Sequence, residues 1–148
     1  MMTSRNVTVA LRCILGLMFV AGPLWTAFHA VPEPGLPPGA AALVGAFASS
    51  GYMLPLLWTT EIAAGVLLLL GIAVPFALVL LAPVIVNILG FHLVLAPNGL
   101  PAALAIGALE LALAWQHRDA FARLFVSPAG DGRRAGEARS TPAWEIPS

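Results

Sequence analysis

The sequence predicts an all-α integral membrane protein, a four-helix bundle with a short interfacial helix between its first and second spans. Of its 148 residues, 59% are hydrophobic and only 9% are charged. The mean hydropathy of +0.91 lies well above that of a water-soluble domain with a charged surface. Four apolar segments each approach the roughly 20 residues that cross a hydrocarbon core about 30 Å thick. A chain this short forms one domain.

The predicted spans are residues 7–30, 52–74, 75–95 and 100–121. The second and third meet at residues 71–75, and the third and fourth at residues 96–101, both rich in turn residues, so these spans are antiparallel neighbours. The first link is longer: it contains the proline-rich residues 31–39 and the alanine-rich residues 40–49. The alanine-rich stretch is too short to span but long enough for an interfacial or re-entrant helix.

The arginines predict the orientation of the spans. Arg5 and Arg12 lie at the start, none lies in a link between spans, and the others lie near the end, at Arg118, Arg123, Arg133, Arg134 and Arg139. Basic residues stay on the cytoplasmic side, so we expect both termini in the cytoplasm and the protein in the bacterial cytoplasmic (inner) membrane. Residues 1–125 then form the membrane domain, and residues 126–148, which lack an apolar period, a disordered cytoplasmic tail.

A cleaved signal peptide is the alternative interpretation of the first segment. Arg5 precedes an apolar core, and residues 27–30 loosely resemble a small-residue cleavage site. Against this, Arg12 interrupts the apolar core, and Phe28 and His29 crowd the site. Removal would also leave three spans with termini on opposite sides, and the placement of the arginines would then be accidental. We therefore favour a retained span.

Several functional classes are excluded or lack a motif. The formal net charge is zero, so there is no broad basic surface for nucleic acid. Cys13 is the only cysteine, which rules out an intrachain disulfide or dithiol relay. The sequence has no CxxC, GxGxxG, Walker loop, HExxH or carboxylate-rich metal cage. No metal site is predicted, and no catalytic residue can be assigned.

Two ionisable residues fall near the cytoplasmic side of the bilayer. From the helical rise, Arg12 and Glu110 both lie about 6 to 10 Å inside it. We predict that they form a structural ion pair between the first and fourth spans, because single buried pairs are commonly structural. Glu110 also belongs to a predicted helix-packing seam of mostly small residues on the fourth span: Ala103, Gly107, Glu110, Ala114 and His117.

A second group of polar and aromatic residues is predicted near the outer side. Glu61 and Asn87 share a depth of about 13 Å from that side. The ligand-binding residues predicted from this outer cluster are Trp25, Trp58, Glu61, Asn87 and His92. Helical periodicity also places Trp58, Glu61 and Gly65 on one face of the second span and Gly22, Trp25 and His29 on one face of the first. We expect these two faces to pack together.

Each of these features has a simpler structural interpretation. Trp25, Trp58 and Trp115 lie close enough to a boundary to be interfacial anchors, which require no ligand. Buried histidines are commonly hydrogen-bonded parts of a bundle, so a haem held by His29 and His92 is not expected. The outer cluster is then either a ligand site or a structural network.

Three segments carry a family resemblance: residues 11–20 followed by Gly22, residues 61–71, and Pro75 followed by residues 82–92. In combination they resemble the DoxX family of small bacterial membrane proteins over about residues 7–125. The resemblance implies a four-span bundle, and the matching positions are Arg12, Gly16, Gly22, Glu61, Gly65, Gly71, Asn87 and His92. The basic residue often found after the second glycine of the first span is absent here, where residues 23–26 read Pro-Leu-Trp-Thr.

Two functions follow as hypotheses. Some members of the family resemble membrane subunits of quinone-linked sulfur oxidoreductases or oxidative-stress complexes, while most have no assigned reaction. The first hypothesis is therefore a non-catalytic or quinone-interacting subunit of a redox complex, with a quinone-like pocket in the outer cluster. The alternative is a membrane scaffold, carrier or assembly protein without catalysis. The expected partners are the lipid bilayer, a redox partner subunit and further copies of the chain in a homo-oligomer, with no nucleic acid.

Overall fold

The computed structural model describes residues 4–29 and 35–124, and it divides the chain into two units, residues 1–117 and residues 118–148. The tail predicted for residues 126–148 lies outside the described residues. The first unit contains helices α1 (Ser4–Ala27), α2 (Pro38–Ser49), α3 (Met53–Leu70), α4 (Val74–Val94), η1 (Pro97–Gly99) and α5 (Leu100–Gln116). The second contains α6 (Arg118–Leu124).

Four helices are long and apolar enough to cross a membrane: α1, α3, α4, and α5 together with η1. This result confirms the four predicted apolar helices and the helical content of the fold. It also confirms a helix in the alanine-rich link, since α2 covers Pro38–Ser49. The fourth predicted segment differs at its end, because α5 stops at Gln116 and a separate helix begins at Arg118.

Local chemistry explains where the helices begin and end. Proline stands in the first turn of α2, α4 and α5, where its missing N–H costs no helical hydrogen bond. Helix α3 ends at Gly71, which has φ 74° and so adopts the left-handed conformation that glycine accepts without strain. At the end of α5, the carbonyl oxygen of Leu113 accepts a hydrogen bond from the backbone N–H of His117 at 3.1 Å, and His117 Nδ1 lies 2.9 Å from the same oxygen.

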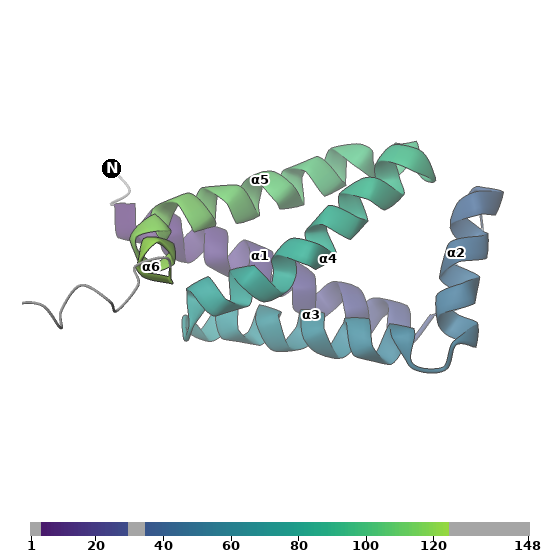
Figure 1. The fold of residues 1–148 in the computed structure, drawn as a ribbon, viewed down its shortest axis with the longest axis horizontal. Helices are drawn as coiled ribbons and strands as arrows, with labels where there is room; N and C mark the ends of the chain where they lie inside the picture. The colour runs from purple at the N-terminus through teal and green to yellow at the C-terminus, as the bar shows by residue number, and fades with distance from the viewer. Residues whose placement is uncertain (1–3, 30–34, 125–148) are drawn as a thin grey trace, which may run out of the picture. The chain divides into compact units, whose positions relative to one another are not determined.

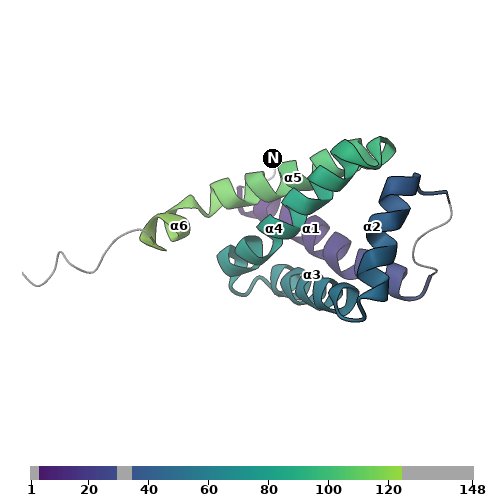
Figure 2. The same ribbon diagram turned by 45° about the vertical axis from the view of Figure 1, so that its right-hand side comes forward.

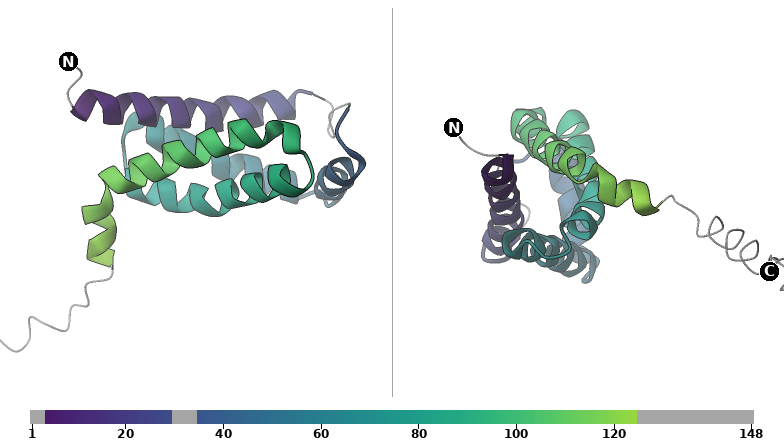
Figure 3. Two further views of the ribbon diagram at one scale, coloured as in Figure 1. Left: turned by 90° about the horizontal axis from the view of Figure 1, so that it is seen from above. Right: turned by 90° about the vertical axis from the view of Figure 1, so that its left-hand side faces the viewer.

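The four long helices form a closed ring of neighbours (Figure 3, right). Helix α1 packs on α3 and α5, and α4 packs on the same two helices. A side-chain hydrogen bond joins Thr8 of α1 to Gln116 of α5, which brings the beginning of one helix to the end of the other. Helices α1 and α5 are therefore antiparallel and share one end of the bundle, here called the inner end.

The closest approach of two helices is between α1 and α3, at Gly16 and Gly65. A Cβ atom added to either glycine would lie 2.8 Å from the backbone carbonyl oxygen of the other. The two backbones are thus in direct contact, as small residues allow in membrane helix packing. The predicted pairing of helix faces holds in part: Gly22 lines a cavity with Trp58 and Glu61, whereas Trp25 is exposed. Gly65 itself meets Gly16, Phe19 and Val20 of α1.

On α3 and α4, buried side chains are confined to the inner part of the bundle. The fully buried large side chains include Leu15 of α1, Leu68 of α3, Leu81 of α4 and Leu113 of α5. On α3 no residue before Glu61 is buried, and on α4 no residue after Ile85 is. Figures 1 and 2 show why the burial stops: α3 and α4 lie close together at the turn that joins them and diverge toward the end where α2 stands.

Helix α2 bridges the open ends of α3 and α4. It packs on α3, and a Cβ atom added to its Gly39 would lie 3.3 Å from Leu95, the residue that follows α4. Figure 1 shows α2 standing across the end of the bundle. The diverging pair is thus covered at its outer end by α2, which at 12 residues is too short to span.

The order of the helices gives a testable topology. In a protein carrying Cys13→Ser, we expect a cysteine introduced at Gly35 to react with an impermeant thiol reagent added outside the cell. A reporter fused after Ser148 should report the cytoplasm, because four spans return the chain to its starting side. Finding both positions on one side would contradict the four-span topology.

Candidate functional site

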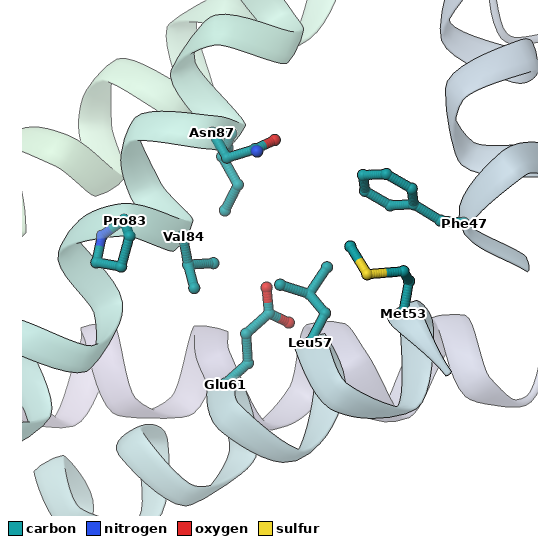
Figure 4. A pocket seen from close by; sticks show the side chains of 8 residues that line it. Phe47, Met53, Leu57, Glu61, Pro83, Val84 and Asn87 are labelled. Atoms are coloured by element: carbon teal, nitrogen blue, oxygen red, sulfur yellow. The ribbon is translucent and has the colours of Figure 1, made fainter. Parts of the chain in front are cut away.

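Two cavities lie side by side in the outer half of the bundle. The larger, of about 460 Å³, is bordered by α1, α3, α4 and α5 and is lined by residues that include Gly22, Trp58, Glu61, Ile88, His92 and Ile106. The smaller, of about 220 Å³, lies between α3 and α4 and faces α2, with a lining that includes Phe47, Met53, Leu57, Glu61, Val84 and Asn87 (Figure 4). Leu57, Glu61 and Ile88 line both, so the two cavities adjoin.

Glu61 is the polar residue that the two cavities share. Its side chain is 8% exposed, and Figure 4 shows its carboxyl group directed away from α3 into the space below Asn87. No hydrogen bond or ion pair joins it to any residue in the described part of the chain. A buried carboxyl group without a protein partner carries a large desolvation cost, so its position favours contact with a ligand or water.

Prolines and a glycine help to create the open space. Pro23 lies inside α1 and is buried, and Pro83 lies inside α4. Each lacks the N–H that would bond to the carbonyl group four residues earlier, which weakens the helix at that level. Gly22 adds room, because a Cβ atom there would meet nothing within 4 Å. Pro23 and Gly22 line the larger cavity, and Pro83 lines the smaller one.

His92 is held in a fixed orientation at the edge of the larger cavity. Its Nδ1 lies 3.0 Å from the carbonyl oxygen of Ala96. Because a carbonyl can only accept, Nδ1 carries the hydrogen, and in the neutral ring Nε2 is an acceptor. The ring also packs directly on Gly99, where a side chain would collide with it. The turn between α4 and α5 thus orients His92.

Two aromatic residues of the predicted outer cluster have different positions. Trp58 lines the larger cavity together with Glu61 and His92. Trp25 is 61% exposed, lines neither cavity and stacks on His29, with ring centroids 3.8 Å apart. His29 Nδ1 lies 2.6 Å from the carbonyl oxygen of Trp25. These two residues thus form a separate pair at the end of α1, apart from His92.

Asn87 lies at the mouth of the smaller cavity. Figure 4 shows its amide on the side of α4 that faces α2. It also lines a third, more open cavity of about 310 Å³ between α2 and α4, together with Leu43, Gly90 and Leu95. Its amide has no hydrogen-bond partner among the described residues. Four of the five predicted ligand residues therefore line the adjoining cavities: Trp58, Glu61, Asn87 and His92.

The inner end holds the two other predicted residues, Arg12 and Glu110. The Arg12 guanidinium packs against Gly71 at the end of α3, where the helix dipole favours a cation. Arg12 Nε and Glu110 Oε1 are both buried, and neither has a hydrogen-bond partner in the described residues. The predicted ion pair is not formed between these atoms here. The pair stays a prediction, because the two residues lie at similar depths. The Thr8–Gln116 contact between the antiparallel helices sets Glu110 level with residue 14, which is about 3 Å along the axis from Arg12.

Several lining residues were not identified from the sequence. Thr26 lines the larger cavity, with its hydroxyl donating to the carbonyl oxygen of Pro23 at 3.0 Å. Leu57, Ile88 and Phe47 supply apolar walls. Leucine and isoleucine occur throughout a chain of this composition, so no sequence signal distinguishes the ones that line a cavity. The proline within each of α1 and α4 was the available clue to where packing loosens.

The described residues contain no group of three or more histidine, cysteine, aspartate or glutamate side chains that could hold a metal ion. Comparison with known proteins found no matching family model, no similar curated protein and no similar solved structure. The site is therefore characterised by its own geometry: a buried carboxyl group, an oriented imidazole and an indole around one cavity, with an amide at the mouth of its neighbour.

Proposed function

We propose that this chain is a DoxX-type protein of the bacterial cytoplasmic membrane and serves as the quinone-binding membrane subunit of a redox or oxidative-stress complex. The observation that carries the proposal is the Glu61 carboxyl group, which is 8% exposed, has no protein partner among the described residues and lines both cavities. The volume of the larger cavity, about 460 Å³, falls in the lower part of the range of small-molecule sites.

The chemistry of the lining suits a quinone headgroup. A protonated carboxyl group can donate a hydrogen bond to a quinone carbonyl oxygen, and Trp58 offers an aromatic face for ring contact. When a quinone takes up two electrons it also takes up two protons, and Glu61 and His92 are the proton-exchanging groups of the larger cavity. The electrons come from a partner subunit, because the sequence carries no flavin or metal motif.

Purification in a mild detergent tests this function. We expect a membrane quinone to co-purify with the wild-type protein in a defined ratio, measured by solvent extraction and mass spectrometry. Glu61→Leu and His92→Ala should lower that ratio about tenfold or more, because each removes a polar contact in a water-poor site. Asn87→Leu should lower it as well, since leucine keeps the volume but forms no hydrogen bond.

The matched control is Glu110→Leu. Glu110 has the same 8% exposure as Glu61 but lines none of the cavities described above. We expect this variant to retain its quinone, whatever its thermal stability in detergent. The proposal is contradicted if the wild-type protein carries no quinone and binds none when it is added. Equal loss of quinone and of thermal stability in all three site variants would instead support a structural network in a scaffold protein.

A further inference from the structure

We propose that the ligand is a long-chain quinone that enters sideways from the hydrocarbon of the bilayer, between α3 and α4 and beneath α2. Its ring occupies the larger cavity beside Trp58, Glu61 and His92, and its isoprenoid chain remains in the smaller cavity under Phe47. This inference rests on the proposed function and adds to it the route of entry and the chemical class of the tail.

The first support is the way α3 and α4 separate. Their buried residues end at Glu61 on α3 and Ile85 on α4, at the level where the cavities begin. Beyond this level the two helices diverge, as Figure 1 shows. Four-helix bundles normally bury side chains along the whole seam between neighbours. An interrupted seam at mid-helix leaves a lateral opening that a narrow apolar chain can occupy.

The second support is the change in lining from one cavity to the next. The smaller cavity is bounded mostly by apolar side chains, among them Met53, Leu57, Val84 and Ile88. The larger one adds the indole of Trp58 and the imidazole of His92. Leu57 and Ile88 belong to both linings and come from α3 and α4 respectively. The arrangement suits a molecule with a polar ring at one end and a flexible hydrocarbon chain at the other.

The third support is the position of α2. Phe47 of α2 lines the smaller cavity, and Leu43 lines the third cavity on the outer face of α4. In Figure 4 the Phe47 ring points from α2 toward the space between Asn87 and Met53. A chain leaving the smaller cavity therefore passes under an aromatic ring. Helix α2 covers the opening from the outer side and leaves the lateral direction, toward lipid, as the way in.

A chain-length experiment with purified protein in detergent tests the route. The ligands are a chainless quinone headgroup, the same headgroup with a ten-carbon chain, and the long-chain isoprenoid quinone. Val84→Trp places an indole in the smaller cavity, because Val84 lines that cavity and not the larger one. We expect it to weaken binding of both chain-bearing ligands about tenfold or more, because a chain and a large side chain then compete for one volume. Binding of the chainless headgroup should change little.

The matched control is Val86→Trp. Val86 lies two residues away on α4, is 68% exposed and lines none of the cavities described above, so the same substitution should leave all three affinities unchanged. Phe47→Ala should weaken the two chain-bearing ligands and spare the headgroup.

The inference is overturned if Val84→Trp affects all three ligands equally. Quinone binding by the wild-type protein would still leave the proposed function intact. A phospholipid that co-purifies with the wild-type protein and is absent from Phe47→Ala would also overturn the inference. The smaller cavity would then hold a lipid acyl chain. Failure of every quinone to bind the wild-type protein would remove the proposed function as well.

Discussion

Gly65→Val is expected to prevent the bundle from packing. A Cβ atom at this position already lies 2.8 Å from the carbonyl oxygen of Gly16 and 2.9 Å from Val20 Cγ2. A backbone carbonyl cannot turn aside as a flexible side chain can, so α1 and α3 must move apart. Overpacking of a core costs about 1 to 3 kcal/mol, and we expect a loss at the upper end of that range or above it. The measurement is the thermal midpoint of the purified protein in detergent.

The matched control for this change is Gly90→Val. Gly90 also lies inside a long helix, α4, but a Cβ atom there would meet nothing within 4 Å. Both substitutions introduce a β-branched residue into a helix, so the difference between them isolates the contact with α1. A variant Gly65→Val that melts at the same temperature as Gly90→Val would show that the Gly16 contact does not hold the bundle together.

The second large effect is expected at the inner end, from Arg12→Met and Glu110→Leu. Arg12 Nε and Glu110 Oε1 are buried on neighbouring helices, and the predicted ion pair would bring opposite charges together where water is scarce. Each single change should destabilise the bundle, because it leaves the other group without its counter-charge. The double variant should recover much of the loss, with a coupling of about 2 kcal/mol in a double-mutant cycle.

Arg5→Met serves as the control for that cycle. Arg5 lies on the same helix and is exposed, so its change should add to Glu110→Leu without coupling. Additive effects of Arg12→Met and Glu110→Leu would show that the two residues do not interact. Arg12 would then act through its contact with Gly71 at the end of α3 alone.

Hydropathy and turn chemistry predicted the four long helices well. Which side of each helix packs against its neighbours was harder to predict. The segment 75–95 corresponds closely to α4 (Val74–Val94), and Gly71 marks the end of α3 as its turn chemistry suggests. The packing face of α1 was predicted only in part. A helix that is apolar on every side gives no polar and apolar stripe from which the buried face can be identified. The Gly16–Gly65 contact carries that information, and it becomes clear only when both helices are seen together.

The candidate site was predictable in its polar residues and not in its shape. Glu61 and His92 stand out because ionisable residues are rare in apolar segments, and the structure brings both to one cavity. Trp25 was predicted on the same outer side of the bundle but lies on the exposed side of α1. The cavities themselves depend on how Pro23 and Pro83 alter two helices that are far apart in the chain. The apolar lining follows from that arrangement, which no single segment encodes.

The shortness of α3 has a consequence for the surrounding bilayer. With 18 residues it is about 27 Å long, whereas the hydrocarbon core of a typical bilayer is about 30 Å thick. In a bilayer of that thickness, the ends of α3 at Met53 and Leu70 meet both interfaces only if the lipids beside the helix compress. Glu61 lies eight residues from Met53, about 12 Å along the axis. A thinned outer leaflet shortens the distance that water must cross to reach this carboxyl group.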